Sequence, residues 1–439
     1  MLPKCATPKQ RQMYEYGMAH NYFILGADMR LGKSLSAISL RKGRNDCNCL
    51  VICPAYLVPN WKKEINKWTK DSVTTFTEGK QIYDVCDSDF VVISYDLVQK
   101  AEFLFEWADF IIADEIQNLA NMSAKRTQFI HRCVYENSPK YFVGLTGTPI
   151  KNRVKEFYSL IALTHYDPNE DSSEFLEQYP DEITFADRFS HSQTYEVQVK
   201  GGRYITIKNY YGLKNVEELK QWLDGKYIRI RADKGDLPPI SYLETLVSDI
   251  DDSDLLESFQ NYFIEDREAY QMSSSFNEAR RNRTGSVLPE HKRNAAVKTV
   301  PFTIKYVENL LQSIDCCLVY SDHRDPCYQM AKHFGVPAIT GEMPGKRRAQ
   351  LVKDFQDGKS KIICATIGSL KEGADLYRAK DLVFNDLSWV PGNIDQVCAR
   401  TQAIHEKDPR TVHLIFGSPQ SEKIWKSLNE KRETINRAT

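Results

Sequence analysis

The sequence predicts an α/β protein with two parallel-sheet lobes in tandem and a helical and β-hairpin insertion between them. Two series of short apolar runs support this prediction, one in the first third of the chain and one from residue 300 onward. Such runs, bounded by polar or turn residues and separated by amphipathic helical patterns, are typical of buried parallel strands joined by helices. We therefore expect a first lobe over residues 1–165, an insertion over 166–300 and a second lobe over 301–439.

The expected elements follow one another as a βαβ series. In the first lobe, helical patterns over 61–68 and 123–136 separate apolar runs, and the predicted strands are 22–27, 48–54, 89–95, 110–115 and 141–147. In the second lobe, the predicted strands are 316–321, 337–340, 361–366, 381–386 and 411–416. In the insertion, residues 194–211 alternate on both sides of Gly201-Gly202, which predicts a β-hairpin with a tight turn.

The composition is that of a folded protein without a strong overall charge. The 439 residues are 42% hydrophobic and 27% charged, which allows a sizeable core. The 58 basic and 59 acidic residues leave a net charge of −1, which excludes a globally basic nucleic-acid coat but not a local basic groove. No apolar run approaches the roughly 18 residues that span a bilayer, and residues 1–12 lack an apolar signal core. We expect a cytosolic or nuclear protein.

The eleven cysteines are scattered, which favours reduced, buried thiols over a disulfide scaffold. Cys47, Cys49 and Cys53 cluster, but no second CxxC or Cys/His pair completes a zinc site.

Residues 26–34, GADMRLGKS, have the composition and context of a phosphate-binding loop, because they follow an apolar strand and precede a helical pattern. Backbone N–H groups at the helix start would hold a β-phosphate, Lys33 would pair with β/γ oxygens and Ser34 would be a Mg²⁺ ligand. The loop departs from the common pattern, since five residues separate Gly26 and Gly32 and Arg30 stands where a glycine is common. The alternative is a helix that merely begins with Ser34 as its N-cap.

Two acidic residues, Asp114 and Glu115, end another apolar strand, and chemistry in open α/β sheets lies at strand carboxyl ends. Asp114 would hold Mg²⁺ through water, Glu115 would orient or deprotonate the attacking water, and Gln117 could sense the γ-phosphate. A solvated turn is the alternative for such a pair. Residues 145–152, LTGTPIKN, follow the next apolar strand, and their hydroxyls could couple the nucleotide state to a bound strand.

In this order, the motifs resemble those of the superfamily-two helicase-like ATPases, and among them the Swi/Snf-type double-stranded DNA translocases. TPKQRQMYEYG over 7–17 is similar to the adenine-reading Q motif, with Gln10 as its glutamine, and motifs I, II and III correspond to 26–34, 114–117 and 145–152. Residues 50–68 and 91–98 resemble segments Ia and Ib. The resemblance implies two RecA-like lobes that bind ATP and Mg²⁺.

The second lobe continues the resemblance. Residues 317–325 resemble motif IV, 339–356 the segment after it, 365–376 motif V, and 385–400 the Trp-x-Pro-Gly stretch that runs into motif VI. The resemblance implies that Thr366 lies near phosphate, that Asp375 lies near the nucleotide, and that Gln396 and Arg400 face ATP. We expect Trp389 to pack in the core rather than to stack on a base.

A subgroup is indicated by residues 210–239 and 292–311, which are similar to the HepA-related annealing-helicase branch. The compact chain also resembles a phage or bacterial branch-migration enzyme. These likenesses imply branch migration, fork reversal or strand annealing, in DNA repair, recombination or replication. We expect a monomer that binds duplex or branched DNA, such as forks and four-way junctions, in the cytoplasm of a bacterium or of a phage-infected host cell.

Motif VI departs from the family pattern Gln-x-x-x-Arg-x-x-Arg, because QVCARTQA places Ala403 at the second arginine. In the family that arginine is a finger toward the γ-phosphate, and such a finger is worth on the order of 10³–10⁵ in rate. Either the finger lies elsewhere, or the protein is a weak ATPase, or an arginine was deliberately replaced by alanine. We favour the last interpretation, because the other motor residues are intact.

DNA contacts are expected mostly with phosphate and sugar, and so without sequence preference. The candidates, each with a solvated or structural role as its alternative, are Ser94, Tyr95, Thr146, Thr148, His323, Arg324 and Thr366. The hairpin tip, with Lys200 and Arg203, could act as a wedge at a branch point, or the hairpin could only cap its lobe. The basic segment 277–293 is either a DNA-phosphate contact or a solvated loop.

Three rival functions remain open. An RNA helicase of the same superfamily is disfavoured by DEIQ over 114–117 and by NWKKEINKW over 60–68. A remodeller of protein–DNA complexes would use the same motor. A hydrolysis-deficient, ATP-gated DNA clamp is suggested only by Ala403.

Overall fold

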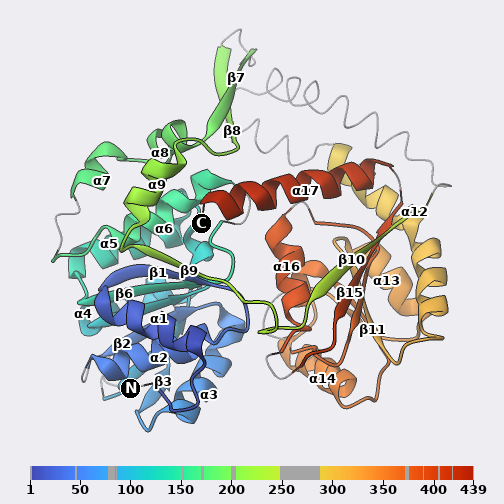
Figure 1. Cartoon of the computed structure of the whole chain (residues 1–439), viewed down its shortest axis with the longest axis horizontal. Coiled ribbons are helices and arrows are strands. Elements are labelled where there is room, and N and C mark those ends of the chain that lie inside the picture. Colours follow the sequence, from blue (N-terminus) through green and yellow to red (C-terminus); the bar gives the residue numbers. More distant parts are fainter. Residues whose placement is uncertain are drawn as a thin grey trace. The chain divides into compact units, whose positions relative to one another are not determined.

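The structure of the chain is a computed structural model that describes most of its residues. The described ranges are 2–44, 47–77, 85, 87–150, 153–169, 173–198, 204–247, 287–370, 375–388, 390–403, 406–417 and 419–438. The chain divides into two compact units, each built around its own parallel sheet (Figure 1). The first comprises Met1–His191, Tyr210–Asp233 and Glu433–Thr439, and the second comprises Ser192–Asn209 and Lys234–Arg432.

The first unit contains a seven-stranded sheet in the order β3-β4-β2-β5-β6-β1-β9, with every neighbouring pair parallel. Its strands are β1 (Tyr22–Ala27), β2 (Cys49–Cys53), β3 (Val73–Thr75), β4 (Phe90–Ser94), β5 (Phe110–Asp114), β6 (Tyr141–Thr146) and β9 (Tyr227–Ile230). Tyr22 and Ile24 belong to one hydrophobic core, whereas Phe23 and Leu25 belong to another. Since successive side chains of a strand point to opposite faces, the sheet has a core on each face. This is why its central strands are continuously apolar.

Helices cover both faces of this sheet (Figure 1). The helices and 3-10 turns are α1 (Pro8–Ala19), α2 (Lys33–Gly43), η1 (Ala55–Leu57), α3 (Val58–Trp68), η3 (Val98–Lys100), α4 (Phe103–Trp107), η4 (Ile116–Leu119), α5 (Lys125–Asn137), η5 (Val154–Glu156), α6 (Phe157–Thr164), α7 (Ser173–Gln178), α8 (Glu182–Phe189) and α9 (Val216–Leu223). Helices α1, α2 and α3 contribute to the core that contains Phe23, and α4, α5 and α6 contribute to the core that contains Tyr22.

The second unit contains a six-stranded parallel sheet in the order β10-β15-β14-β11-β13-β12. Its strands are β10 (Ile240–Leu246), β11 (Cys317–Ser321), β12 (Ala338–Ile339), β13 (Ile362–Thr366), β14 (Asp381–Phe384) and β15 (Arg410–Phe416). Its helices are α12 (Val287–Leu310), α13 (Arg324–His333), α14 (Gly345–Gln356), α15 (Ile367–Leu370), α16 (Pro391–Ala399) and α17 (Pro419–Ala438), the last of which ends in residues that cluster with the first unit. Leu318 and Tyr320 pack into one core and Val319 into another, so this sheet too is buried on both faces.

All ten strands predicted in the two apolar series are confirmed, with shifts of a few residues at their ends. The predicted hairpin is confirmed as a two-stranded sheet of β7 (His191–Gln198) and β8 (Tyr204–Tyr211), and its tip at 199–203 lies outside the described residues. Of the basic segment 277–293, only residues 287–293 are described, and they begin α12. The chain thus forms two parallel sheets in tandem, with helices between successive strands, and this confirms the predicted fold class.

The expected insertion over 166–300 is divided between the units. Residues 210–233 belong to the first unit and supply β9 to its sheet, whereas residues 234–300 belong to the second unit and supply β10. The sequence did not predict β9, β10 or β3. Each of the three lies at the edge of its sheet, and β10 is largely exposed, so none requires a continuous apolar run.

No helix in the described part of the chain is long and apolar enough to cross a membrane.

Candidate active site

The predicted phosphate-binding loop lies between a buried strand and a helix of the first unit. Strand β1 ends at Ala27, and helix α2 begins at Lys33 with Gly32 as its N-cap. Gly32 has a φ of 87°, a conformation that glycine adopts without strain. The first N–H groups of a helix have no partner inside the helix, so the start of α2 offers donors to an anion. Arg30, which stands where a glycine is common, also has a positive φ, of 70°.

Gln10 lies against this loop. Its backbone N–H donates to the Thr7 hydroxyl at 3.2 Å, and its side-chain oxygen accepts from the Thr7 backbone N–H at 2.9 Å, which caps the start of α1. A Cβ atom added to Gly32 would lie 2.1 Å from the Gln10 side-chain nitrogen. The structure therefore places the glutamine of the Q-like segment beside the phosphate loop, and its role in reading adenine stays a prediction.

Lys33, the first residue of α2, turns its amine toward the end of β1. The amine donates to the carbonyl of Ala27 at 2.8 Å and to that of Asp28 at 3.3 Å. Burial lowers the pKa of this amine, and the nearby carboxylates of Glu115 and Asp114 oppose that shift. The structure therefore brings the lysine that is predicted to pair with phosphate close to the predicted acidic pair, although about 80 residues separate them in the sequence.

Asp114 ends β5 and is almost fully buried. One of its carboxylate oxygens accepts from the indole N–H of Trp61 on α3 at 2.8 Å, and the other accepts from the Glu115 backbone N–H at 2.9 Å. Burial raises the pKa of Asp114 to about 7, and the charge of Glu115 adds to that shift. Two fixed donors thus set the orientation of this carboxylate.

Glu115 follows in the left-handed conformation, with a φ of 49°. The side-chain nitrogen of Gln117 donates to its carboxylate, and the Asn118 side chain donates to its carbonyl at 2.9 Å. The side-chain oxygen of Gln117 is buried and has no hydrogen-bond partner among the described residues. Since buried polar atoms usually find a partner, this oxygen is available to a ligand.

The residues fit the Mg²⁺ that the sequence predicts. Mg²⁺ prefers hard oxygen ligands, which the carboxylate of Asp114 and the hydroxyl of Ser34 supply. A buried carboxylate with a raised pKa gains most from a neighbouring cation. The described residues contain no group of three or more His, Cys, Asp and Glu side chains that could hold a metal ion.

The DNA-contact candidates of the first unit lie near the carboxyl ends of their strands. Ser94, Tyr95 and Thr146 are buried, and Thr148 is partly exposed. The hydroxyl of Tyr95 donates to the Asp114 carbonyl at 3.0 Å, and the Thr146 hydroxyl accepts from the Thr148 backbone N–H at 3.0 Å. The hydroxyls of Tyr95 and Thr146 thus bind other residues of the site, and the contact of these candidates with DNA stays a prediction.

The motif VI candidates lie on or beside α16 of the second unit. Gln396 is buried within the helix, Arg400 is its C-cap, and Ala403 follows in the next loop. The Arg400 carbonyl accepts from the backbone N–H of Leu376 at 2.9 Å, which brings the segment of Asp375 to the end of α16. The structure thus brings the predicted motif V and motif VI residues together within the second unit.

The DNA-contact candidates of the second unit lie at or just after the carboxyl ends of strands β11 and β13. Thr366 lies opposite Ser321 at the carboxyl ends of β13 and β11, and the Ser321 hydroxyl accepts from the His323 backbone N–H at 3.1 Å. The His323 ring lies 4.0 Å from the Asp386 carboxylate, and burial lowers its pKa. Arg324 forms an exposed ion pair with Glu342.

The candidates Lys200 and Arg203, together with Trp389, lie outside the described residues.

Three residues of the candidate site, Trp61, Arg229 and Asp28, had no predicted role. Trp61 orients Asp114, and Arg229 on β9 forms an ion pair with Asp28 at 2.6 Å. The tryptophans of segment Ia carried the family resemblance, but no pattern in the sequence pairs positions 28 and 229, because β9 is an edge strand with no apolar run.

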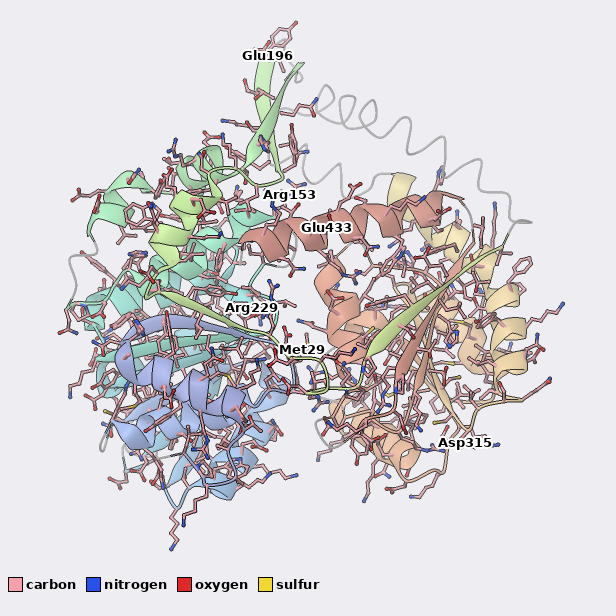
Figure 2. All side chains as sticks on the ribbon, viewed as in Figure 1. Met29, Arg153, Glu196, Arg229, Asp315 and Glu433 are labelled. Atoms are coloured by element: carbon pink, nitrogen blue, oxygen red, sulfur yellow. The ribbon has the colours of Figure 1, made fainter. Side chains whose placement is uncertain are left out.

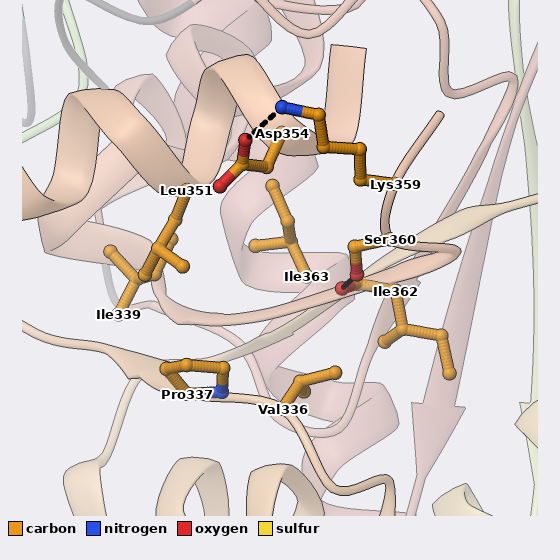
Figure 3. Close-up of a pocket in the computed structure, with 9 residues that line it drawn as sticks. All are labelled: Val336, Pro337, Ile339, Leu351, Asp354, Lys359, Ser360, Ile362 and Ile363. Atoms are coloured by element: carbon orange, nitrogen blue, oxygen red, sulfur yellow. Dashed lines mark hydrogen bonds and ion pairs between the residues drawn. The ribbon is translucent and has the colours of Figure 1, made fainter. Parts of the chain in front are cut away.

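A separate small cavity of about 210 Å³ lies in the second unit and contains none of the predicted site residues (Figure 3). Its lining is mostly aliphatic, and Figure 3 shows an ion pair between Asp354 and Lys359 at its rim, 3.0 Å long. It has no cluster of donors for a phosphate.

Two protein families match the chain. The SNF2-related domain matches residues 11–237, more than half of the chain, and the helicase conserved C-terminal domain matches residues 303–404.

Individual relatives are similar over nearly the whole chain at low identity. The chromodomain-helicase-DNA-binding protein 1-like of Mus musculus is 22% identical over 95% of this chain and 47% of its own length. The DNA annealing helicase and endonuclease ZRANB3 of Bos taurus is 22% identical over 93% of this chain and 38% of its own length. The chain thus spans less than half the length of these relatives. Among solved structures, the SWI2/SNF2 ATPase core of Sulfolobus solfataricus in complex with dsDNA has 21% identity and a TM-score of 0.41, and covers 98% of this chain with 92% of its own.

Proposed function

The chain belongs to the SNF2-related family, and from that premise we propose that it is an ATP-dependent DNA translocase that remodels branched DNA. The observation that carries the proposal is the meeting of Lys33, Asp114 and Glu115 at the carboxyl edge of one parallel sheet. A phosphate-binding lysine beside a buried carboxylate pair is what phosphoryl transfer to water requires.

The proposed chemistry follows from these positions. The N–H groups at the start of α2 and the Lys33 amine neutralise phosphate charge, while Ser34 and Asp114 would hold Mg²⁺. A bound Mg²⁺ supplies electrostatic stabilisation of the charge that develops on the phosphate oxygens. Glu115 accepts a proton from the attacking water, and the amide of Gln117 fixes the orientation of that carboxylate.

The same proposal assigns parts to the second unit. Asp375, Gln396 and Arg400 complete nucleotide binding, and Thr366 and His323 belong to the surface that holds DNA. Contacts with phosphate and sugar would make binding independent of sequence and steeply dependent on salt. Branched DNA as the substrate is supported by the likeness of residues 210–239 and 292–311 to annealing helicases, and by the similarity of the chain to ZRANB3, a DNA annealing helicase.

The test is steady-state ATP hydrolysis by the chain and by its Ala403→Arg variant, each without DNA, with linear duplex and with a four-way junction. We expect the arginine variant to hydrolyse ATP faster by several orders of magnitude, because a finger contributes on the order of 10³–10⁵ in rate. We expect the junction to stimulate it most. A fast, DNA-stimulated reaction in the unaltered chain would show that the finger lies elsewhere.

A second candidate function is an ATP-gated DNA clamp that does not hydrolyse ATP, and the observation that favours it is Ala403. Both forms of the chain would then bind ATP without turnover. A remodeller of protein–DNA complexes would give turnover but no activity on naked junctions.

A further inference from the structure

Arg229 lies where the phosphate loop leaves the sheet. Strand β9 pairs with β1 in parallel, and the register sets Arg229 opposite Gly26, one residue before the end of β1. Figure 2 shows Arg229 on β9 beside the loop that carries Met29. The pairing of β9 with β1 therefore brings the Arg229 side chain within reach of the phosphate loop.

Its guanidinium joins two of the predicted motifs. One terminal nitrogen donates to the Asp28 carboxylate at 2.6 Å, and the other donates to the Gly147 carbonyl in the LTGTP segment at 3.4 Å. The second carboxylate oxygen of Asp28 accepts from the Ala232 backbone N–H at 2.9 Å, and the Asp28 N–H donates to the Ile230 carbonyl at 2.9 Å. Asp28 is therefore hydrogen-bonded to β9 and to Ala232, which follows β9, through its own backbone N–H and both of its carboxylate oxygens.

The same Asp28 also accepts from Lys33, which is the residue predicted to pair with phosphate. Asp28 thus links the two cations, because its carboxylate accepts from Arg229 and its carbonyl accepts from Lys33. The amine donates to the carbonyls of Ala27 and Asp28, so a phosphate that draws the amine toward itself would lengthen these two bonds and move the loop. The Asp28 side chain stays bound to Arg229 and Ala232, so a movement of the loop is passed to the end of β9.

The residues after β9 carry the chain from one unit to the other. Asp233 is the last residue of this part of the first unit, and Lys234 belongs to the second. Asp233 forms an ion pair at 2.7 Å with Lys9, the neighbour of Gln10 on α1. The stretch that leaves the unit is thus attached to both elements expected to contact the nucleotide.

We propose that Arg229 is a positioning residue that couples occupancy of the phosphate loop to residues 232–234, through which the chain passes to the second unit. The inference rests on the proposed function in so far as the occupant of the loop is a nucleoside triphosphate. Arg229 acts through Asp28 and Gly147 and needs no contact with the nucleotide.

The experiment compares Arg229→Gln with Arg231→Gln in the full chain. Arg231 is a matched control, because it lies two residues along, is exposed, and donates to the Asn436 carbonyl at 3.2 Å instead of to the loop. Hydrogen exchange is measured with and without Mg²⁺ and a slowly hydrolysed ATP analogue, in peptides covering 28–36 and 227–234. ATP hydrolysis is measured in parallel with duplex DNA.

In the unaltered chain and in Arg231→Gln, we expect the analogue to change exchange in both peptides. In Arg229→Gln, we expect the change at 28–36 to remain and the change at 227–234 to be lost. We also expect kcat to fall about tenfold or more while KM for ATP changes less than about threefold, because a charge-assisted bond outside the binding contacts is removed. Arg229→Lys should restore part of kcat, since a lysine keeps the charge but not the two-pronged geometry.

Several results would overturn the coupling. One is an undiminished exchange response at 227–234 in Arg229→Gln, and another is loss of both responses together, which a purely structural role would give. Should Arg229→Gln fail to fold, Asp28→Asn removes the same ion pair and must lose the response at 227–234. An analogue response in both peptides, with no hydrolysis by the unaltered chain or by its Ala403→Arg variant, would refute the proposed function and leave the coupling standing. No response in either peptide would refute both.

Discussion

Replacing Trp61 by phenylalanine tests whether the orientation of Asp114 matters to the reaction. Trp61 lies on α3, is 1% exposed and packs in the core on one face of the first sheet. Its indole N–H donates to the Asp114 carboxylate at 2.8 Å. Phenylalanine keeps a buried aromatic ring in that place and removes the donor, so the substitution changes the carboxylate more than the core.

The expected size follows from that one bond. A hydrogen bond to a charged group is worth roughly 1.5–3 kcal/mol, which corresponds to a factor of about 10 to 100 in an equilibrium constant. Removing a group that orients a metal ligand costs about 10–100-fold in metal affinity or activity. Both estimates predict that the Mg²⁺ concentration for half-maximal ATP hydrolysis rises by about tenfold or more.

The assay is a Mg²⁺ titration of ATP hydrolysis, with urea unfolding as a measure of stability. Trp68→Phe is the matched control, because Trp68 lies on the same helix and its indole N–H donates to Glu64 at 2.8 Å, away from Asp114. We expect its Mg²⁺ dependence to equal that of the unaltered chain. The same Mg²⁺ dependence in both variants would refute the assignment of Asp114 as a ligand held by Trp61.

Three further outcomes follow from the geometry of the first unit. Gly32→Ala should weaken nucleotide binding about tenfold in an equilibrium fluorescence titration, because its φ of 87° costs alanine roughly 1–2 kcal/mol and its Cβ, 2.1 Å from the Gln10 side-chain nitrogen, would displace that side chain; binding within threefold of the unaltered chain would contradict this. Arg30→Gly should be more stable to urea than Arg30→Ala by about 1 kcal/mol, since both lose the side chain and only glycine adopts a φ of 70° without cost; equal stabilities would argue against strain at this position. Burial lowers the pKa of His131 and of His165 from 6.5 to about 4, so protonation favours the unfolded state. The stability that these histidines contribute is complete above pH 6.5 and falls as the pH is lowered toward 4. At pH 5 the loss is about 2 kcal/mol for each of them, measurable as earlier urea unfolding of the first unit, and a His131→Gln variant should lose less.

The central strands of both sheets could be predicted because burial on two faces demands apolar residues at consecutive positions. Residues 22–27 and 316–321 illustrate this, since each forms a strand that is buried along its length. Strand β10 could not be predicted in this way, because most of its side chains are exposed and its pairing with β15 depends on a segment about 170 residues later in the chain. A short edge strand has no periodic signal that separates it from a loop.

The reactive groups of the candidate site were predicted for a similar reason. Lys33, Asp114 and Glu115 each follow an apolar run, and parallel strands carry their carboxyl ends to the same edge. The groups that hold them in place were not predicted. Trp61 reaches Asp114 from a helix 53 residues earlier, and Arg229 reaches Asp28 across 201 residues.

The sequence by itself therefore determined the two sheets, the phosphate loop and the acidic pair, because local hydrophobicity and the direction of parallel strands decide where these lie. Only the tertiary structure decided which side chains fix their geometry. The pairing of β9 with β1 brings Arg229 to Asp28, and the packing of α3 on the sheet brings Trp61 to Asp114. Such contacts depend on register and on the packing of helices against strands, which join residues distant in the chain and leave no pattern in the residues between them.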